Sequence, residues 1–256
     1  MELGLAGKVV LITGGSRGIG RSIAHGFADE GASIAFCARG QEQVDTTAGE
    51  LRAKGTRVFS ASADVRDPPA LERFVESAAT ELGRIDILVN NAGGGTGSGI
   101  VETTDEQWRQ SLELNFSSTV VASRAVIPHL RKQGGGAIVN ISSISAMDHA
   151  GQLGYNAFKA AQITFGRVLA KELVKDNIRV VSVAPGSIIF PGGGWQRRLD
   201  ADPEAMARWM EHELPAGRFG RPEEIANVVV FVASERASWV NGEVIRVDGL
   251  QSRWVF

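Results

Sequence analysis

Tyr155 and Lys159 form the pair of residues in this sequence best suited to proton transfer. They lie four positions apart in Gln152–Val174, whose apolar spacing predicts a helix, so both side chains share one helical face. A phenol can give a proton to an oxygen atom, but its ordinary pKa of about 10 slows exchange near neutral pH. Because a neighbouring cation favours the phenolate, we expect Lys159 to lower the pKa of Tyr155. Tyr155 is the sole tyrosine of the chain.

A glycine-rich turn, Thr13–Gly20 (TGGSRGIG), lies between a predicted strand and a predicted helix. Glycines allow a sharp turn and a close approach of the backbone to a pyrophosphate, whose charge meets free N–H groups at the start of the helix. The alternative is a tight turn without a ligand. The expected phosphate-binding residues are Gly14, Gly15, Ser16, Arg17, Gly18, Ile19 and Gly20.

The end of the second predicted strand indicates which dinucleotide would bind. An acid there would accept hydrogen bonds from a ribose 2′-hydroxyl, whereas a cation would pair with a 2′-phosphate. The sequence has Arg39 and no acid. We therefore predict NADP(H) over NAD(H), with Arg39 on the 2′-phosphate, helped by Arg17 and Ser16. On the alternative interpretation both arginines are solvated surface residues.

Strands and helices alternate along the chain, which favours right-handed crossovers and a mostly parallel sheet covered on both faces. The fold class is therefore α/β and doubly wound, with residues 1–256 as one domain. The predicted strands are Lys8–Thr13, Ser33–Ala38, Arg57–Ala63, Asp86–Asn90, Ala137–Ile141, Ile178–Ala184 and Glu243–Val247. The predicted helices are Gly18–Glu30, Gln41–Lys54, one that starts at Pro68 and Pro69, Thr104–Gln133, Gln152–Val174 and Pro222–Ser234.

Composition narrows the functional classes. The 27 basic and 29 acidic residues nearly cancel, which argues against nucleic acid or an anionic membrane as a partner. Cys37 is the single cysteine, so a disulfide framework is excluded. No apolar run approaches the roughly 18 residues of a membrane span. The four histidines show no metal spacing, and no metal is expected. We expect a soluble, cytoplasmic protein.

The ordered set of TGGSRGIG, Asn90–Gly93 (NNAG) and Tyr155-x-x-x-Lys159 resembles the short-chain dehydrogenase/reductase family, and in particular its 3-oxoacyl-ACP reductase-like members. The resemblance runs from Lys8 to about Gly249. It implies a Rossmann-type sheet of about seven parallel strands and a homotetramer or homodimer. It also implies cofactor contacts from Asp64, Val65, Asn90, Ala92, Gly93, Tyr155, Lys159, Pro185, Gly186 and Ile188.

The same resemblance implies a catalytic set of Asn115, Ser143, Tyr155 and Lys159. Tyr155 would give a proton to a carbonyl oxygen while hydride reaches the carbon. Ser143 would hold that oxygen near Tyr155. Lys159 would also bind the nicotinamide ribose, and Asn115 would hold a water that links Lys159 to solvent.

The sequence departs from the family at two points. The spacing from the serine to Tyr155 is one residue shorter than in many members, so Ser142 and, less favoured, Ser145 are alternatives to Ser143. Phe190 stands where many members have a threonine that touches the nicotinamide amide. Ser187 or backbone groups near Ile188 are candidate substitutes for that contact.

The substrate side is less determined. Residues 187–217 are expected to form a mobile lid, whose tryptophans Trp195 and Trp209 would either face an apolar substrate or anchor a lid helix. The glycine-rich segment Gly93–Gly99 could leave room for substrate, and His149 could contact it. The apolar tail Ser252–Phe256 would pack at a subunit interface or on its own domain.

These features together predict an oxidoreductase that transfers hydride between NADP(H) and a ketone or secondary alcohol. A 3-oxoacyl-thioester reductase is the first choice, and a sugar or polyol dehydrogenase is the alternative. A non-catalytic NADP(H)-binding regulator would not need Ser143, Tyr155 and Lys159. A hydrolase based on His149 lacks the G-x-S-x-G turn that such enzymes use.

Overall fold

The computed structural model describes residues 2–148 and 151–253. Its centre is a seven-stranded sheet in the order β3-β2-β1-β4-β5-β6-β7, and every neighbouring pair runs parallel. The predicted α/β, doubly wound class is confirmed. The strands are β1 (Val9–Thr13), β2 (Ser33–Ala38), β3 (Val58–Ser62), β4 (Ile87–Asn90), β5 (Gly136–Ile141), β6 (Ile178–Pro185) and β7 (Val244–Val247).

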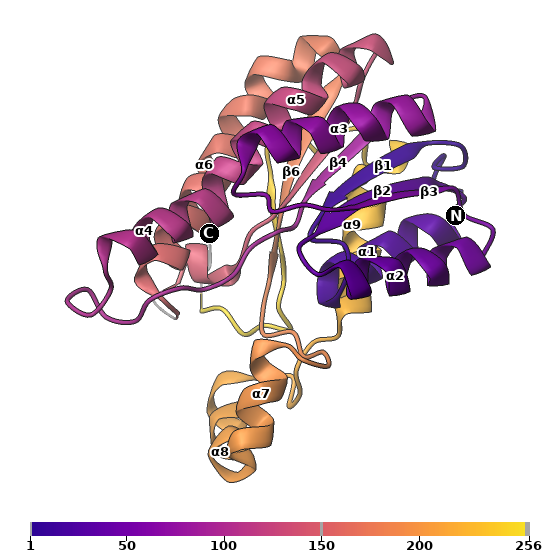
Figure 1. The fold of residues 1–256 in the computed structure, drawn as a ribbon. Coiled ribbons are helices and arrows are strands. Elements are labelled where there is room, and N and C mark those ends of the chain that lie inside the picture. Colours follow the sequence, from indigo (N-terminus) through magenta and orange to yellow (C-terminus); the bar gives the residue numbers. More distant parts are fainter. Residues whose placement is uncertain (1, 149–150, 254–256) are drawn as a thin grey trace.

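Helices cover both faces of this sheet. In Figure 1, α1 (Gly18–Asp29), α2 (Gln41–Ala53) and α9 (Pro222–Ala233) lie below the sheet, whereas α3 (Pro68–Leu82), α5 (Ser118–Lys132) and α6 (Leu153–Leu173) lie above it. The central strands are buried on both faces, which is why β1 and β4 consist of apolar residues followed by one polar residue at the end. Predicted element ends differ from the observed ones by only one or two residues.

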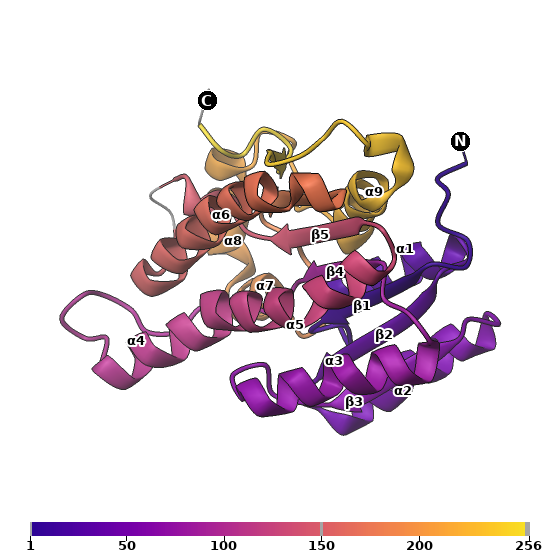
Figure 2. The same cartoon turned by 90° about the horizontal axis from the view of Figure 1, so that it is seen from above.

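The predicted continuous helix Thr104–Gln133 is wrong in one respect. The structure has α4 (Asp105–Leu112), then a π turn (Glu113–Ser117), and then α5. In the π turn, the N–H of Ser118 donates to the carbonyl of Glu113, five residues earlier. The two helices continue along nearly one line (Figure 2), so the turn adds a residue without a large bend. This extra residue turns Asn115 toward the loop that follows β4.

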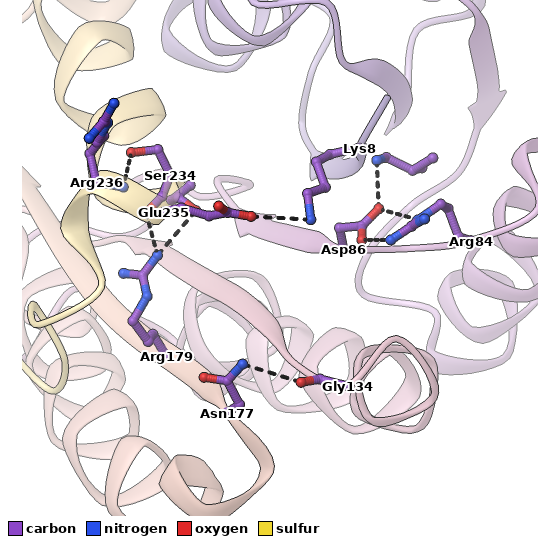
Figure 3. A network of polar contacts seen from close by, with 11 residues as sticks. Lys8, Arg84, Asp86, Gly134, Asn177, Arg179, Ser234, Glu235 and Arg236 are labelled. Atoms are coloured by element: carbon purple, nitrogen blue, oxygen red, sulfur yellow. Dashed lines mark hydrogen bonds and ion pairs between the residues drawn. The ribbon is translucent and has the colours of Figure 1, made fainter. Parts of the chain in front are cut away.

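A polar network fastens the amino-terminal edge of the sheet (Figure 3). The Arg179 guanidinium donates to the carbonyls of Val232, Ala233 and Ser234, where α9 ends. Asp86, before β4, accepts from the backbone N–H of Val9 at 2.9 Å and from Arg84 Nε at 2.8 Å. These contacts join β1, β4, β6 and α9, and they leave the opposite, carboxyl edge free for a site.

The segment between β6 and α9 forms a small helical unit. It holds α7 (Gly194–Ala201) and α8 (Pro203–Glu213), which stand apart from the main body beyond the carboxyl edge of the sheet (Figure 1). Trp195 and Trp209 stack with ring centroids 4.4 Å apart, and Phe219 packs against both. The aromatic stack therefore serves as a separate apolar core for this unit.

Within residues 2–148 and 151–253, no helix is both long and apolar enough to span a bilayer. The same described residues hold no cluster of three or more metal-ligating His, Cys, Asp or Glu side chains. His149, and Trp254–Phe256 of the apolar tail, lie outside the described residues.

Candidate active site

A cavity of about 640 Å³ lies at the carboxyl ends of strands β1 to β6. In an open parallel sheet this edge is where ligands bind. The glycine-rich turn forms one wall, and Tyr155 and Lys159 from α6 form another. Trp195 from α7 reaches the same cavity. Residues from nearly the whole chain therefore meet at one place.

The glycine-rich turn is closely packed against the end of β4. Gly14 has a φ of +70°, a conformation that side chains disfavour. A β-carbon at Gly20 would lie 2.2 Å from the Gly14 carbonyl oxygen. Asn91 Nδ2 donates to the carbonyls of Thr13 and Gly14, both at 2.9 Å. Asn91 thus holds the turn in shape while the start of α1 remains at the cavity.

Arg17 and Arg39 line one end of the cavity. Within the part of the chain that the structure describes, neither guanidinium has an ion pair or a side-chain hydrogen bond. The nearby acid, Asp64, is instead bound by Arg66, whose Nε and Nη2 lie 2.6–3.1 Å from the carboxylate oxygens. Hydrogen bonds from Arg66 lower the pKa of Asp64. Arg17 and Arg39 are thus unpaired cations near a helix N-terminus, and the nearby Asp64 is already paired with Arg66. This arrangement fits a dinucleotide that carries an extra phosphate.

Lys159 is 2% exposed and lines the other end of the cavity. Its Nζ donates to the Ile141 carbonyl at 2.7 Å and to Gln162 Oε1 at 3.3 Å. It lies 5.9 Å from the centroid of the Tyr155 ring. Burial lowers the pKa of Lys159 to about 7, because a charged group is costly to take out of water.

The expectation that Lys159 lowers the pKa of Tyr155 is wrong in this structure. Burial raises the pKa of Tyr155, and a side-chain hydrogen bond with Ser143 acts in the opposite direction. The Lys159 Nζ donates to the Ile141 carbonyl, and removal of the phenol from water is the main cause of its raised pKa. The phenol is therefore protonated at neutral pH.

The three candidate serines occupy different positions. Ser143 and Ser142 both line the cavity, whereas Ser145 does not. The Ser142 hydroxyl donates to the Lys159 carbonyl at 3.1 Å. The Ser143 hydroxyl accepts from the backbone N–H of Ser145 at 3.1 Å, so its own proton can be donated. Ser143 is the serine that hydrogen-bonds with Tyr155.

Asn115 is fully buried and lies behind the cavity rather than on its wall. Its side chain accepts from the N–H of Gly94 and donates to the Gly94 carbonyl, both at 2.9 Å. A β-carbon at Gly93 would lie 3.1 Å from both Asn115 Oδ1 and Lys159 Nζ. Asn115 therefore fixes the loop that passes Lys159. The water predicted at Asn115 remains a prediction.

The sequence is similar to known proteins over most of its length. A family model described as Enoyl-(Acyl carrier protein) reductase matches residues 14–249. The 3-oxoacyl-[acyl-carrier-protein] reductase FabG of Thermotoga maritima is 37% identical over 246 residues, which are 96% of this chain and 98% of that protein. This chain belongs to the short-chain dehydrogenase/reductase family. It therefore falls among oxidoreductases that act on CH–OH and C=O groups.

Solved structures of the family match over nearly the whole chain. The crystal structure of L-sorbose reductase from Gluconobacter frateurii, complexed with NADPH and L-sorbose, has a TM-score of 0.95 and 38% identity, with all of both chains covered. A 7α-hydroxysteroid dehydrogenase complexed with NADH has a TM-score of 0.90 and 33% identity, covering 100% of this chain and 98% of that one. Members with this fold thus differ in both cofactor and substrate.

The structure brings most of the predicted site residues of this family member to the cavity wall. They are Gly14, Ser16, Arg17, Ile19, Gly20, Arg39, Asp64, Val65, Ala92, Gly93, Ser143, Tyr155, Lys159, Pro185, Gly186 and Ile188. Gly15, Gly18, Asn90 and Asn115 are not on the wall. Asn90 instead donates to Asn140 Oδ1 at 2.9 Å and to Ser123 at 3.2 Å, joining β4 to β5 and α5.

The cavity wall also includes residues outside the predicted cofactor and catalytic sets: Ala38, Gly40, Gln43, Ala63, Asn91, Gly94, Gly95, Leu114, Ile141, Ser142, Phe190, Gly194 and Trp195. Among them, Ser142 is the alternative serine, and Gly94, Gly95 and Trp195 belong to segments predicted to lie near the substrate. Asn91 could have been found, because it lies inside the Asn90–Gly93 motif. Phe190 departs from the family pattern and is one of the lid aromatics. In the structure its ring covers Gly18, where a β-carbon would lie 2.6 Å from a ring atom.

Proposed function

We propose that this chain is an NADPH-dependent reductase of ketones. The observation that carries the proposal is that Ser143, Tyr155 and Lys159 share one cavity with two unpaired guanidiniums, Arg17 and Arg39. A protein that only bound a nucleotide would need no proton donor at the far end of the cavity. The non-catalytic regulator is therefore the weaker alternative.

The preference for NADP(H) over NAD(H) rests on the nucleotide end. Arg39 and Arg17 would bind the 2′-phosphate through charge-assisted hydrogen bonds, with Ser16 beside them. Asp64 would not repel that phosphate strongly, because Arg66 already neutralises its carboxylate. The NADPH-bound L-sorbose reductase supports this choice as a relative of similar length and fold.

The other end of the cavity would carry out the proton transfer. A bound nicotinamide would supply hydride to the carbonyl carbon. Ser143 would donate a hydrogen bond to the carbonyl oxygen and hold it against Tyr155, whose phenol would give that oxygen a proton. Lys159 would stabilise the resulting phenolate and present an N–H to the nicotinamide ribose.

Protonation favours the reducing direction at neutral pH. Because burial raises the pKa of Tyr155, the phenol carries at neutral pH the proton that carbonyl reduction consumes. Oxidation of an alcohol would require the phenolate as a base, and this form is disfavoured. At neutral pH the protonation state of Tyr155 therefore suits carbonyl reduction.

The substrate class proposed first is a 3-oxoacyl thioester. It is supported by the 37% identity with the Thermotoga maritima enzyme. Reduction of a sugar ketone is the second candidate, and it is supported by the match of L-sorbose reductase over all of both chains. The lid of residues 187–217, with Trp195 on the cavity wall, would close over either substrate.

One assay tests the function and separates the candidates. NADPH absorbance would be followed with acetoacetyl-CoA and, in parallel, with L-sorbose, and both reactions repeated with NADH. We expect NADPH consumption, faster with the thioester. Faster reduction of L-sorbose would select the second candidate. Binding of NADPH without reduction of a broad set of ketones would contradict the proposed reductase.

We further propose that the chain acts in the cytoplasm as a homotetramer or homodimer. Family resemblance is the support for this assembly. Analytical ultracentrifugation of the purified protein at micromolar concentration would test it, and a monomer would contradict it.

A further inference from the structure

Gln162 is a fully buried glutamine on α6, three residues after Lys159. Glutamine is seldom buried completely, and a buried amide is costly unless both of its ends find partners. Here Oε1 accepts from Lys159 Nζ at 3.3 Å, and Nε2 donates to Thr119 Oγ1 at 2.7 Å. The side chain thus joins the lysine of the active site to a different helix, α5.

Lys159 needs such a partner because its ammonium is buried. An ammonium has three N–H donors. One of them is used by the Ile141 carbonyl at the end of β5, and a second by Gln162. This leaves one donor for a molecule bound in the cavity that Lys159 lines.

Lys159 determines which end of the Gln162 amide faces it, because an ammonium can only donate hydrogen bonds. If the amide were reversed, its NH₂ group would meet the Lys159 ammonium, and two donors would face each other. Thr119, 2% exposed, accepts from the NH₂ group through its hydroxyl, so both ends of the amide are paired. The orientation of the amide is therefore fixed by Lys159, and its far end is anchored on α5 by Thr119.

Across the described segments, no negatively charged side chain near Lys159 could stabilise its ammonium in place of Gln162. Tyr155 is the titratable neighbour on α6. The segments packed around Lys159 place three uncharged groups near its ammonium: the carbonyl of Ile141, the backbone of Gly93 and, near Gly93, the amide of Asn115. Among the described residues, no carboxylate forms an ion pair with Lys159.

We propose that Gln162 is a positioning residue that holds the Lys159 ammonium between Ile141 and the cavity. The proposal rests on the proposed function, because it gives Lys159 its role in proton transfer. Gln162 does not line the cavity, so it would act only through Lys159. The unfavourable burial of Lys159 is offset in part by this hydrogen bond, which favours the charged form over the neutral amine.

The direct test measures Lys159 itself and needs no activity. Lysines labelled with ¹³C at Cε would be titrated by NMR in the wild type and in Gln162→Met, with the Lys159 signal assigned from Lys159→Arg. Methionine keeps length and volume but removes the acceptor. We expect the pKa of Lys159 to fall by about one unit in Gln162→Met. Gln162→Glu, which keeps an acceptor oxygen, should raise it above the wild-type value.

Matched variants separate positioning from packing. Gln110→Met makes the same change on α4, where the side chain bonds only to the neighbouring Glu106, and should leave Lys159 unchanged. If Gln162→Met does not fold, Thr119→Val removes the acceptor of the amide NH₂ group, so the amide is held less firmly, and should lower the same pKa by a smaller amount. An identical Lys159 titration in the wild type and in the folded variants would overturn the proposal.

Kinetics give a second readout. In Gln162→Met the alkaline decline of kcat/KM for ketone reduction should move to lower pH, and Gln162→Glu should restore it. A purely structural role would lower the melting temperature and leave the pH profile in place. Failure of the wild type to oxidise NADPH would contradict the proposed function alone, since the NMR titration still decides the role of Gln162.

Discussion

The Ser142 hydroxyl donates to the Lys159 carbonyl at 3.1 Å, whereas the adjacent Ser143 hydrogen-bonds with the Tyr155 side chain. Two consecutive serines at the end of β5 thus have different partners on α6. One holds the helix backbone, and the other joins the group proposed to donate a proton. This difference could not be read from the sequence, in which both serines fit the family pattern.

Substitution of each serine separates these roles. Ser143→Ala should lower kcat about 100-fold, because it removes a hydrogen bond to the carbonyl oxygen that strengthens as charge develops there. Ser142→Ala should keep most of the activity and lower the free energy of unfolding by about 1 kcal/mol. Steady-state kinetics and denaturant melts measure both. A large loss of kcat in Ser142→Ala alone would reverse the assignment.

Substitution of the two free arginines tests the cofactor preference. Arg39→Ala should raise KM for NADPH by about 10-fold to 100-fold, since a charge-assisted hydrogen bond to phosphate contributes about 1.5–3 kcal/mol. KM for NADH should change little, because NADH lacks the 2′-phosphate. Arg17→Ala should act in the same direction. Equal effects on both cofactors would contradict the assigned contact.

Gly20 and Gly49 offer a matched pair of glycine-to-alanine changes. In Gly20→Ala the new β-carbon would lie 2.2 Å from the Gly14 carbonyl, so the turn would distort and NADPH binding should be lost. In Gly49→Ala, within α2, no atom lies within 4 Å of the new carbon. This control should raise the free energy of unfolding by about 0.5–1 kcal/mol. NADPH binding would be measured by calorimetric titration. Normal NADPH affinity in Gly20→Ala would contradict the role assigned to the turn.

The pH dependence of stability should reveal the buried Lys159. Burial lowers its pKa to about 7 in the folded state, from an ordinary value of 10.5. Between these values the unfolded chain binds more protons, so this group makes the free energy of unfolding rise with pH. Below about pH 7 both states are protonated, and the full cost of burial is present. Lys159→Met should therefore be more stable than the wild type near pH 7, on the order of a few kcal/mol.

The advantage of Lys159→Met should shrink as the pH approaches 10. Urea melts at several pH values would show this as converging free energies of unfolding for the two proteins. Lys175→Met, a change on the exposed turn after α6, provides a control without such a trend. A constant difference between wild type and Lys159→Met across pH 7–10 would contradict the burial argument.

Much of the fold could be predicted because its signals are local. Apolar runs such as Val9–Thr13 are buried on both faces of the sheet, and the glycine-rich turn sits directly after the first of them. The π turn could not be predicted in this way. The apolar spacing of Thr104–Gln133 fits an ordinary helix, and the π turn coincides with a tertiary contact between Asn115 and Gly94 that no local pattern reveals.

In the site, too, sequence motifs identify the residues that lie in local patterns but not those whose role depends on tertiary contacts. Tyr155, Lys159 and the glycine turn were identified from motifs that short stretches of sequence contain. Gln162 has no such motif, since a glutamine in a helix is ordinarily solvated, and its role depends on Thr119 from α5. The raised pKa of Tyr155 also depends on burial by distant segments, which spacing along one helix cannot reveal.

The central claim is that the Tyr155 phenol donates the proton during carbonyl reduction. Tyr155→Phe removes only the hydroxyl oxygen, so NADPH titration should give nearly the wild-type affinity. The rate of NADPH oxidation at saturating ketone should fall by about 100-fold to 10,000-fold, the usual contribution of a general acid. Near-normal turnover by Tyr155→Phe would contradict the claim.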